Sequence, residues 1–159
     1  MKKLLSVTLI LLAFTLLVFS SPATAGDKAT KEECVSMCKK AAAMVKEKGL
    51  EATLKAINDP HGPFVWKDTY VFALSTADGK TLAHPFKPGL IGKNLMGVKD
   101  INGVMLFAEF LKIGKSKAGE GWVEYMWPKP GEKKPSKKVT YIYKVPGHDV
   151  SFGAGVYID

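Results

Sequence analysis

The sequence predicts an α+β fold, in which one long N-terminal helix covers an antiparallel sheet of about five strands. Three observations lead to this prediction. Apolar residues recur at helical spacing early in the chain, alternate with a period of two in the middle, and alternate again in three segments near the C-terminus. Short turns rich in glycine and proline separate the alternating segments, which is typical of antiparallel neighbours. A helix followed by such strands indicates the α+β class.

The first 25 residues are typical of a secretory signal. Lys2 and Lys3 precede an apolar run over Leu4–Phe19, and the small residues Ala23-Thr24-Ala25 form a cleavage site. The run has 16 residues, short for a membrane span of about 20. We therefore expect cleavage near Ala25 and one domain over 26–159, periplasmic or secreted, with an uncleaved anchor as the alternative. No second apolar segment follows, so we expect a soluble stand-alone form.

Helical signals follow the signal segment. Thr30 to Glu33 reads T-K-E-E, a capping box that predicts a helix starting near Thr30. Gly49 is a plausible C-cap, and a second short helix is expected over residues 50–57. The apolar stripe of the first helix consists of Cys34, Cys38, Ala41, Ala42 and Val45.

The period changes to two at Tyr70, which begins a strand up to Ser75. Asp78-Gly79 predicts a tight hairpin turn, and the chain returns over residues 80–84. A two-residue turn would pair Ala73 with His84 and place both on one face of the sheet, with Tyr70 on the other.

The second half of the chain predicts one helix and three strands. Asn102 is a candidate N-cap for a helix over residues 103–113. The strands are expected over 121–127, 138–145 and 150–157.

The composition limits the classes of function. All 23 basic residues are lysine, and the predicted mature chain keeps 21 lysines against 15 acidic residues, a net charge of +6. Export and the absence of arginine argue against nucleic acid as a partner and favour anionic small molecules or the envelope surface. No nucleophile–base pair, H-E-x-x-H motif or compact histidine cluster can be named. We therefore expect no enzyme, no metal site and no cofactor.

Cys34 and Cys38 lie four residues apart on the predicted first helix. A disulfide within one regular helical turn is strained, so packing of both thiols against the sheet is the favoured interpretation. A redox or metal-binding pair is the alternative.

Tyrosines and tryptophans concentrate on or beside the predicted strands. Most strand aromatics belong to a core, but their polar tips need partners when buried. Several of them in one small sheet, with Lys67, His84 and Lys138 near, suit a small anionic ligand. These aromatics are Trp66, Tyr70, Trp122, Tyr125, Trp127, Tyr141, Tyr143 and Tyr157.

Four segments in combination resemble the single Cache domain family. They are "NDPHGPFVWKDTYVFALSTADGKTLAHP", "LIGKNL", "GWVEYMWPKP" with a following Lys-x-x-Tyr, and "GHDVSFGAGVY". The resemblance covers residues 30–159. It implies a PAS-like antiparallel sheet under a long N-terminal helix, a ligand pocket on that sheet, and a role as an extracytoplasmic sensor. Many family members bind acetate, propionate, pyruvate or similar small carboxylates.

The resemblance also implies a set of ligand-binding residues. Lys138 is expected near the pocket mouth, where its charge meets the anion, while tyrosine hydroxyls hold the carboxylate and tryptophan rings pack its apolar part. The alternative is an envelope interaction module, or an accessory subunit of a membrane sensor protein, with no ligand of its own. The candidate site residues are Trp66, Tyr70, His84, Trp122, Tyr125, Lys138 and Tyr141.

Overall fold

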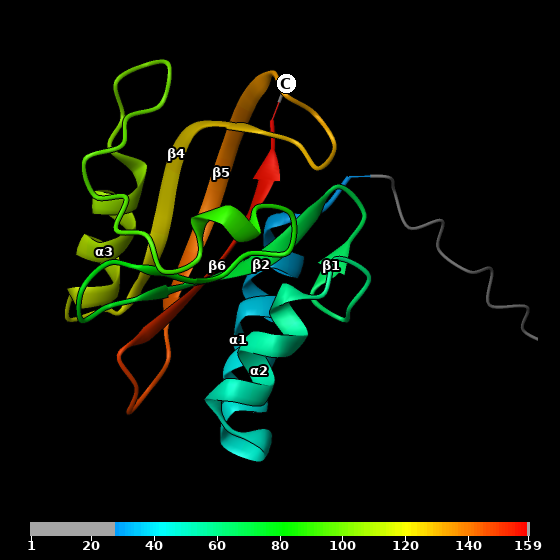
Figure 1. Ribbon diagram of the computed structural model, residues 1–159, viewed down its shortest axis with the longest axis vertical. Coiled ribbons are helices and arrows are strands. Elements are labelled where there is room, and N and C mark those ends of the chain that lie inside the picture. The colour runs from blue at the N-terminus through cyan, green and yellow to red at the C-terminus, as the bar shows by residue number, and fades with distance from the viewer. Residues whose placement is uncertain (1–27, 159) are drawn as a thin grey trace, which may run out of the picture.

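The computed structural model describes residues 28–158, so the predicted signal segment lies outside the described residues. The α+β prediction is confirmed: two N-terminal helices lie on one side of an antiparallel sheet and a third helix lies on the other (Figure 1). The helices are α1 (Lys31–Lys48), α2 (Leu50–Asn58), the short 3-10 helix η1 (Pro88–Leu90) and α3 (Leu106–Lys115).

The sheet has six strands, in the order β1-β2-β6-β5-β4, with β3 paired to β2 off this path. The sixth strand, beyond the five expected, is the two-residue β1. Every pairing between named strands is antiparallel. The strands are β1 (Val65–Trp66), β2 (Thr69–Ser75), β3 (Thr81–Ala83), β4 (Glu120–Pro128), β5 (Pro135–Lys144) and β6 (Val150–Tyr157).

The capping box at the start of α1 is confirmed. The Thr30 hydroxyl accepts a hydrogen bond from the Glu33 amide, and the Glu33 carboxylate accepts one from the Thr30 amide. The helix ends at Gly49, whose φ of 84° is readily adopted only by glycine. The apolar stripe of α1, including Cys34 and Cys38, packs against β2, β5 and β6. Both cysteines are fully buried, which confirms that they pack in this core.

The register expected for the first hairpin is wrong by one residue. Ala73 pairs with Ala83 rather than with His84, because a bulge between Ala73 and Leu74 shifts the register and the turn is longer than two residues. A one-residue slip moves a side chain to the other face of a sheet. His84 therefore lies beside Tyr70, with 4.8 Å between the ring centroids.

The start of the third helix also differs from expectation. The helix α3 begins at Leu106, and Asn102 does not cap it. Asp100 organises the preceding turn instead, because its carboxylate accepts hydrogen bonds from the amides of Asn102, Val104 and Met126. The last of these bonds fixes the turn to β4, so the position of α3 over the sheet depends on Asp100.

The two faces of the sheet form two cores. The α1 face holds Val71, Phe152 and Ala154, and the α3 face holds Phe72 and Ile142. On β6 the residues that face α3 include Gly153 and Gly155. A Cβ at Gly153 would lie 2.3 Å from the Phe72 ring, and one at Gly155 would lie 2.9 Å from the Lys138 side chain. The middle of the central strand therefore carries no side chain on this face, and side chains of neighbouring strands extend across Gly153 and Gly155.

None of the helices within residues 28–158 combines the length and apolar character that crossing a membrane requires.

Candidate ligand-binding site

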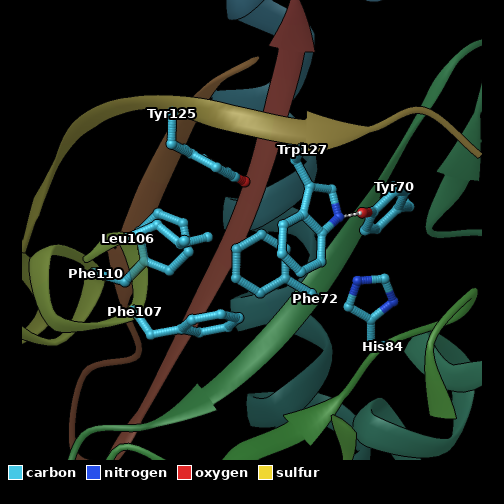
Figure 2. Close-up of a pocket in the computed structure, with 8 residues that line it drawn as sticks. All are labelled: Tyr70, Phe72, His84, Leu106, Phe107, Phe110, Tyr125 and Trp127. Atoms are coloured by element: carbon cyan, nitrogen blue, oxygen red, sulfur yellow. Dashed lines mark hydrogen bonds between the residues drawn. The ribbon is translucent and has the colours of Figure 1, made fainter. Parts of the chain in front are cut away.

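A small cavity lies on the α3 face of the sheet (Figure 2). Strands β2 and β4 supply opposite walls, and α3 covers it with apolar side chains. The space open to the centre of a water molecule is about 10 Å³, which is room for about one water. The lining residues are Tyr70, Phe72, His84, Leu106, Phe107, Phe110, Tyr125 and Trp127.

Two hydrogen bonds fix the polar tips at this cavity. The Trp127 indole N–H donates to the Tyr70 hydroxyl at 3.0 Å, which connects the β4 wall to the β2 wall (Figure 2). The Tyr125 hydroxyl lies 2.9 Å from the Thr140 hydroxyl. Burial raises the pKa of Tyr70 and of Tyr125 above the ordinary range of a phenol. Both hydroxyls are therefore neutral and can donate or accept.

His84 is held as a neutral ring in one tautomer. Its Nδ1 atom accepts hydrogen bonds from the amides of Phe86 and Lys87, at 3.3 and 3.1 Å. A neutral imidazole that accepts at Nδ1 carries its proton on Nε2. Burial and, to a lesser degree, the positive charges of Lys138 and Lys87 together lower the pKa of His84 to about 3. His84 thus presents an N–H donor beside Tyr70 and Trp127.

Lys138 is a fully buried cation behind the cavity wall. Its Nζ donates to the Tyr157 hydroxyl at 3.3 Å, and it lies 4.2 Å from the centroid of the Tyr70 ring and 4.6 Å from that of Tyr157. Among the described residues it forms no ion pair. Burial lowers its pKa to about 7. The expected position at the pocket mouth is wrong, because the residue has no exposed surface.

Four of the seven candidate residues lie together on the α3 face. Tyr70, His84 and Tyr125 line the cavity, and Lys138 lies against Tyr70 and pairs with Tyr125 across the two strands.

The other three lie on the α1 face, away from the cavity. Trp122 pairs with Tyr141, and both side chains point opposite to Tyr125 because side chains alternate along a regular strand. The Trp122 ring lies under the Lys31 ammonium, and the Tyr141 hydroxyl donates to Glu120. Trp66 packs against the α1 core.

Five cavity residues were not among the seven candidates predicted from the sequence. Trp127 could have been predicted from the sequence, because it stands two residues after Tyr125 on one strand and therefore shares the face of Tyr125. Phe72 stands in the same relation to Tyr70. The α3 residues Leu106, Phe107 and Phe110 depend on where the helix packs, which no local pattern gives.

Within residues 28–158, no three His, Cys, Asp or Glu side chains gather in the way that a metal ion requires.

The chain is similar to sensory proteins. A family model described as "Cache domain" matches residues 32–159. The methyl-accepting chemotaxis protein McpP of Pseudomonas putida is 28% identical over 106 residues, which are 67% of this chain and 18% of that protein. The sensor histidine kinase MctS of Rhizobium johnstonii is 31% identical over 93 residues, which are 58% of this chain and 20% of that protein. The match thus spans about a fifth of each of these relatives.

Solved structures with the same fold are also sensory. A Cache chemosensory domain described for carboxylic acid recognition superposes with a TM-score of 0.70 at 28% identity, over 80% of this chain and 92% of the other. A methyl-accepting chemotaxis protein of Vibrio parahaemolyticus gives 0.69 at 26% identity, over 81% and 88%. The periplasmic sensor domain of a chemotaxis protein gives 0.63 at 26% identity, over 80% and 90%.

Proposed function

Because this chain belongs to the Cache domain family, we propose that it binds a small organic anion, such as a short carboxylate, on the α3 face of its sheet. Its role is that of an extracytoplasmic sensor domain, with a membrane sensor protein as its partner in signalling. The carboxylic acid recognition described for a structural neighbour supports this class of ligand.

Lys138, a buried cation that forms no ion pair with any of the residues 28–158, carries the proposal. A buried ammonium group loses its hydration, and in a stable core it is paired with a carboxylate. Here the side chain has no exposed surface, donates a hydrogen bond to the neutral hydroxyl of Tyr157, and otherwise faces two aromatic rings. An anion that reaches Lys138 supplies the missing charge. A lysine is a point charge, which is adequate for one carboxylate.

Neutral donors near the cavity complete the recognition of a carboxylate. The Nε2–H of His84 and the hydroxyl of Tyr125 donate hydrogen bonds to its oxygens, and the Tyr70 hydroxyl becomes available if the ligand displaces Trp127. The apolar part of the ligand packs on Phe72, Phe107 and Phe110. In this arrangement both histidine and tyrosine act without charge, so the positive charge that meets this carboxylate comes from Lys138.

The size of the cavity restricts the ligand and its affinity. Space for one water does not admit a carboxylate unless side chains move, so binding has to shift the α3 rings or open the Trp127–Tyr70 contact. A ligand with five heavy atoms, at a ceiling of about 1.5 kcal/mol per atom, gains about 7 kcal/mol. This corresponds to a Kd of roughly 10 μM or weaker.

The test is a thermal-shift screen followed by titration calorimetry. Acetate, propionate and pyruvate are compared with acetamide and propionamide, which have the same shape without the charge. The expected result is binding of at least one acid and none of its amide. Equal responses to acid and amide, or no response to any acid at millimolar concentration, would refute the proposal.

The small cavity favours one competing function. If Tyr70, Phe72 and the α3 rings never separate, the domain is an accessory subunit whose partner is a membrane sensor, with no ligand of its own. The exposed apolar side chains Val98 and Ile101 next to α3 are consistent with such a contact. The same screen separates the two functions, since only the first gives a stabilising anion.

A further inference from the structure

A second pocket adjoins the cavity, and Tyr70 lines both. This outer pocket lies between Phe86–Lys87 and the turn of residues 128–132, and its volume is about 210 Å³. It is therefore far roomier than the cavity, which has space for about one water. An anion that reaches Tyr70 from this side meets the outer pocket first.

Two half-buried lysines line the outer pocket. The Lys87 ammonium lies 5.4 Å from the centroid of the Trp127 ring, and the Lys129 ammonium lies 5.8 Å from that of Tyr157. Within the described part of the chain neither forms an ion pair. Glu132 is the acidic side chain among the residues that line this pocket.

Together with Lys138, these lysines place three cations around one aromatic cluster. Lys138 shares the Tyr157 ring with Lys129, and it lies against Tyr70, which is the boundary between the two spaces. One carboxylate at Lys138 compensates one of these charges. Glu132 offsets at most one of the remaining two, so the outer pocket keeps a net positive charge when a single carboxylate is bound.

We propose that the outer pocket is a second anion subsite of the same ligand, so that the preferred ligand is a short dicarboxylate. Its first carboxylate meets Lys138, and its second lies between Lys87 and Lys129. This inference rests on the proposed function and narrows its ligand to acids with two negative groups.

The experiment compares succinate, its monoamide succinamate, and butyrate, which share a four-carbon skeleton. Affinities for the purified protein are measured by titration calorimetry at pH 7. Succinate is expected to bind about three- to tenfold more tightly than succinamate, because the second carboxylate gains a charge-assisted contact at a partly exposed site. In a Lys87→Met/Lys129→Met double variant the ratio of the two affinities is expected to fall to about one.

A matched control makes the same change in net charge at lysines outside the outer pocket. Lys48 and Lys55 are exposed on α1 and α2, so the double variant Lys48→Met/Lys55→Met removes the same two charges without touching the pocket. It should retain the preference for succinate. If wild type binds butyrate or succinamate but shows no preference for succinate, or if the double variant keeps the preference, the second subsite is wrong and the proposed function stands. If no anion binds, the proposed function fails.

Discussion

The Nζ atom of Lys138 lies 4.2 Å from the centroid of the Tyr70 ring, so this buried cation rests on an aromatic face where a core would ordinarily supply a carboxylate. A ring face compensates only part of the lost hydration. The residue therefore weakens the fold of the empty protein, and a bound anion would repair that weakness.

Replacing Lys138 with methionine should weaken anion binding and strengthen the empty fold. Binding is expected to lose about 1.5–3 kcal/mol, the scale of a charged hydrogen bond. The free energy of unfolding should rise by about 1–4 kcal/mol, because an apolar side chain of similar length replaces an uncompensated buried charge. Titration calorimetry measures the first effect and urea denaturation without ligand measures the second.

Lys137→Met is the matched control for this substitution. Lys137 is the neighbouring residue on β5, points to the opposite face, is exposed, and pairs with Glu124 at 2.6 Å. Its loss should change stability by less than about 1 kcal/mol and leave binding intact. Equal anion affinity in wild type and Lys138→Met would remove Lys138 from the site.

Anion affinity should fall as the pH rises above 7. Burial lowers the pKa of Lys138 to about 7, so the empty site loses its positive charge above that pH. Affinity is then expected to fall by about tenfold for each pH unit above 7, until the pKa of the complex is reached. Calorimetry between pH 6 and 9, in buffers of different ionisation enthalpy, should also show proton uptake on binding.

The other titratable side chains around Lys138 do not account for this dependence on pH. Tyr70 on β2, Tyr125 on β4 and Tyr157 on β6 have pKa values raised by burial, as does Cys34 on α1, so all four stay protonated in this range. The carboxylate of Asp68 raises the pKa of Lys138, opposite to the effect of burial. It also accepts a hydrogen bond from the Ala29 amide. An affinity that stays constant from pH 6 to 9 would contradict the role of Lys138.

Regular alternation along the strands explains both the successes and the errors of the sequence argument. Tyr125 lines the cavity, but Trp122 stands three residues before it, and β4 pairs with β5 without a bulge over this stretch. Residues three apart on a regular strand point to opposite faces. The same rule separates Tyr141 from Lys138. The family resemblance named segments that the structure brings to the sheet, while strand periodicity decides which side chains reach the cavity.

Other features of the site depend on contacts distant in sequence. The bulge in β2 sets the face of His84, and the Asp100–Met126 bond sets the position of α3. Neither leaves a signal within a short window of sequence, so the histidine was assigned to the wrong face and the α3 side chains were missed. The first two helices, the capping box and the three C-terminal strands depend on local signals, and these predictions were confirmed.

His84 should make the folded protein sensitive to acid. Burial lowers its folded pKa to about 3, so between pH 6.5 and 3 the unfolded chain binds a proton that the folded protein does not. The contribution of His84 to stability is therefore complete above pH 6.5 and is lost as the pH falls toward 3. Urea denaturation at pH 6.5 and 4 should show a loss of up to about 3 kcal/mol that His84→Asn lacks.

His61→Asn is the control for the histidine prediction, because His61 is exposed at the end of α2. This variant should keep the wild-type dependence on pH. If His84→Asn loses stability in acid as steeply as wild type does, His84 is not the group responsible.

The two cysteines should be unreactive in the folded protein and reactive after unfolding. Both thiols are fully buried in the α1 core and are free, and burial raises the pKa of Cys34 to about 12. Iodoacetamide should modify neither thiol in buffer and both in urea without reductant, as counted by intact mass. Thiols that resist alkylation in urea until a reductant is added would reveal a disulfide.

Alanine at Gly153 should destabilise the fold by about 1–3 kcal/mol. A Cβ at this position would clash with the Phe72 ring, which forms part of the cavity wall and lies over this glycine. Phe72 then has to move into the cavity, so anion binding should weaken together with stability. Gly89→Ala is the control, because a Cβ there meets nothing within 4 Å. Urea denaturation and the carboxylate titration measure the two effects. A Gly153→Ala protein as stable as wild type would contradict this prediction. It would show that the Phe72 ring moves away from β6 at little cost.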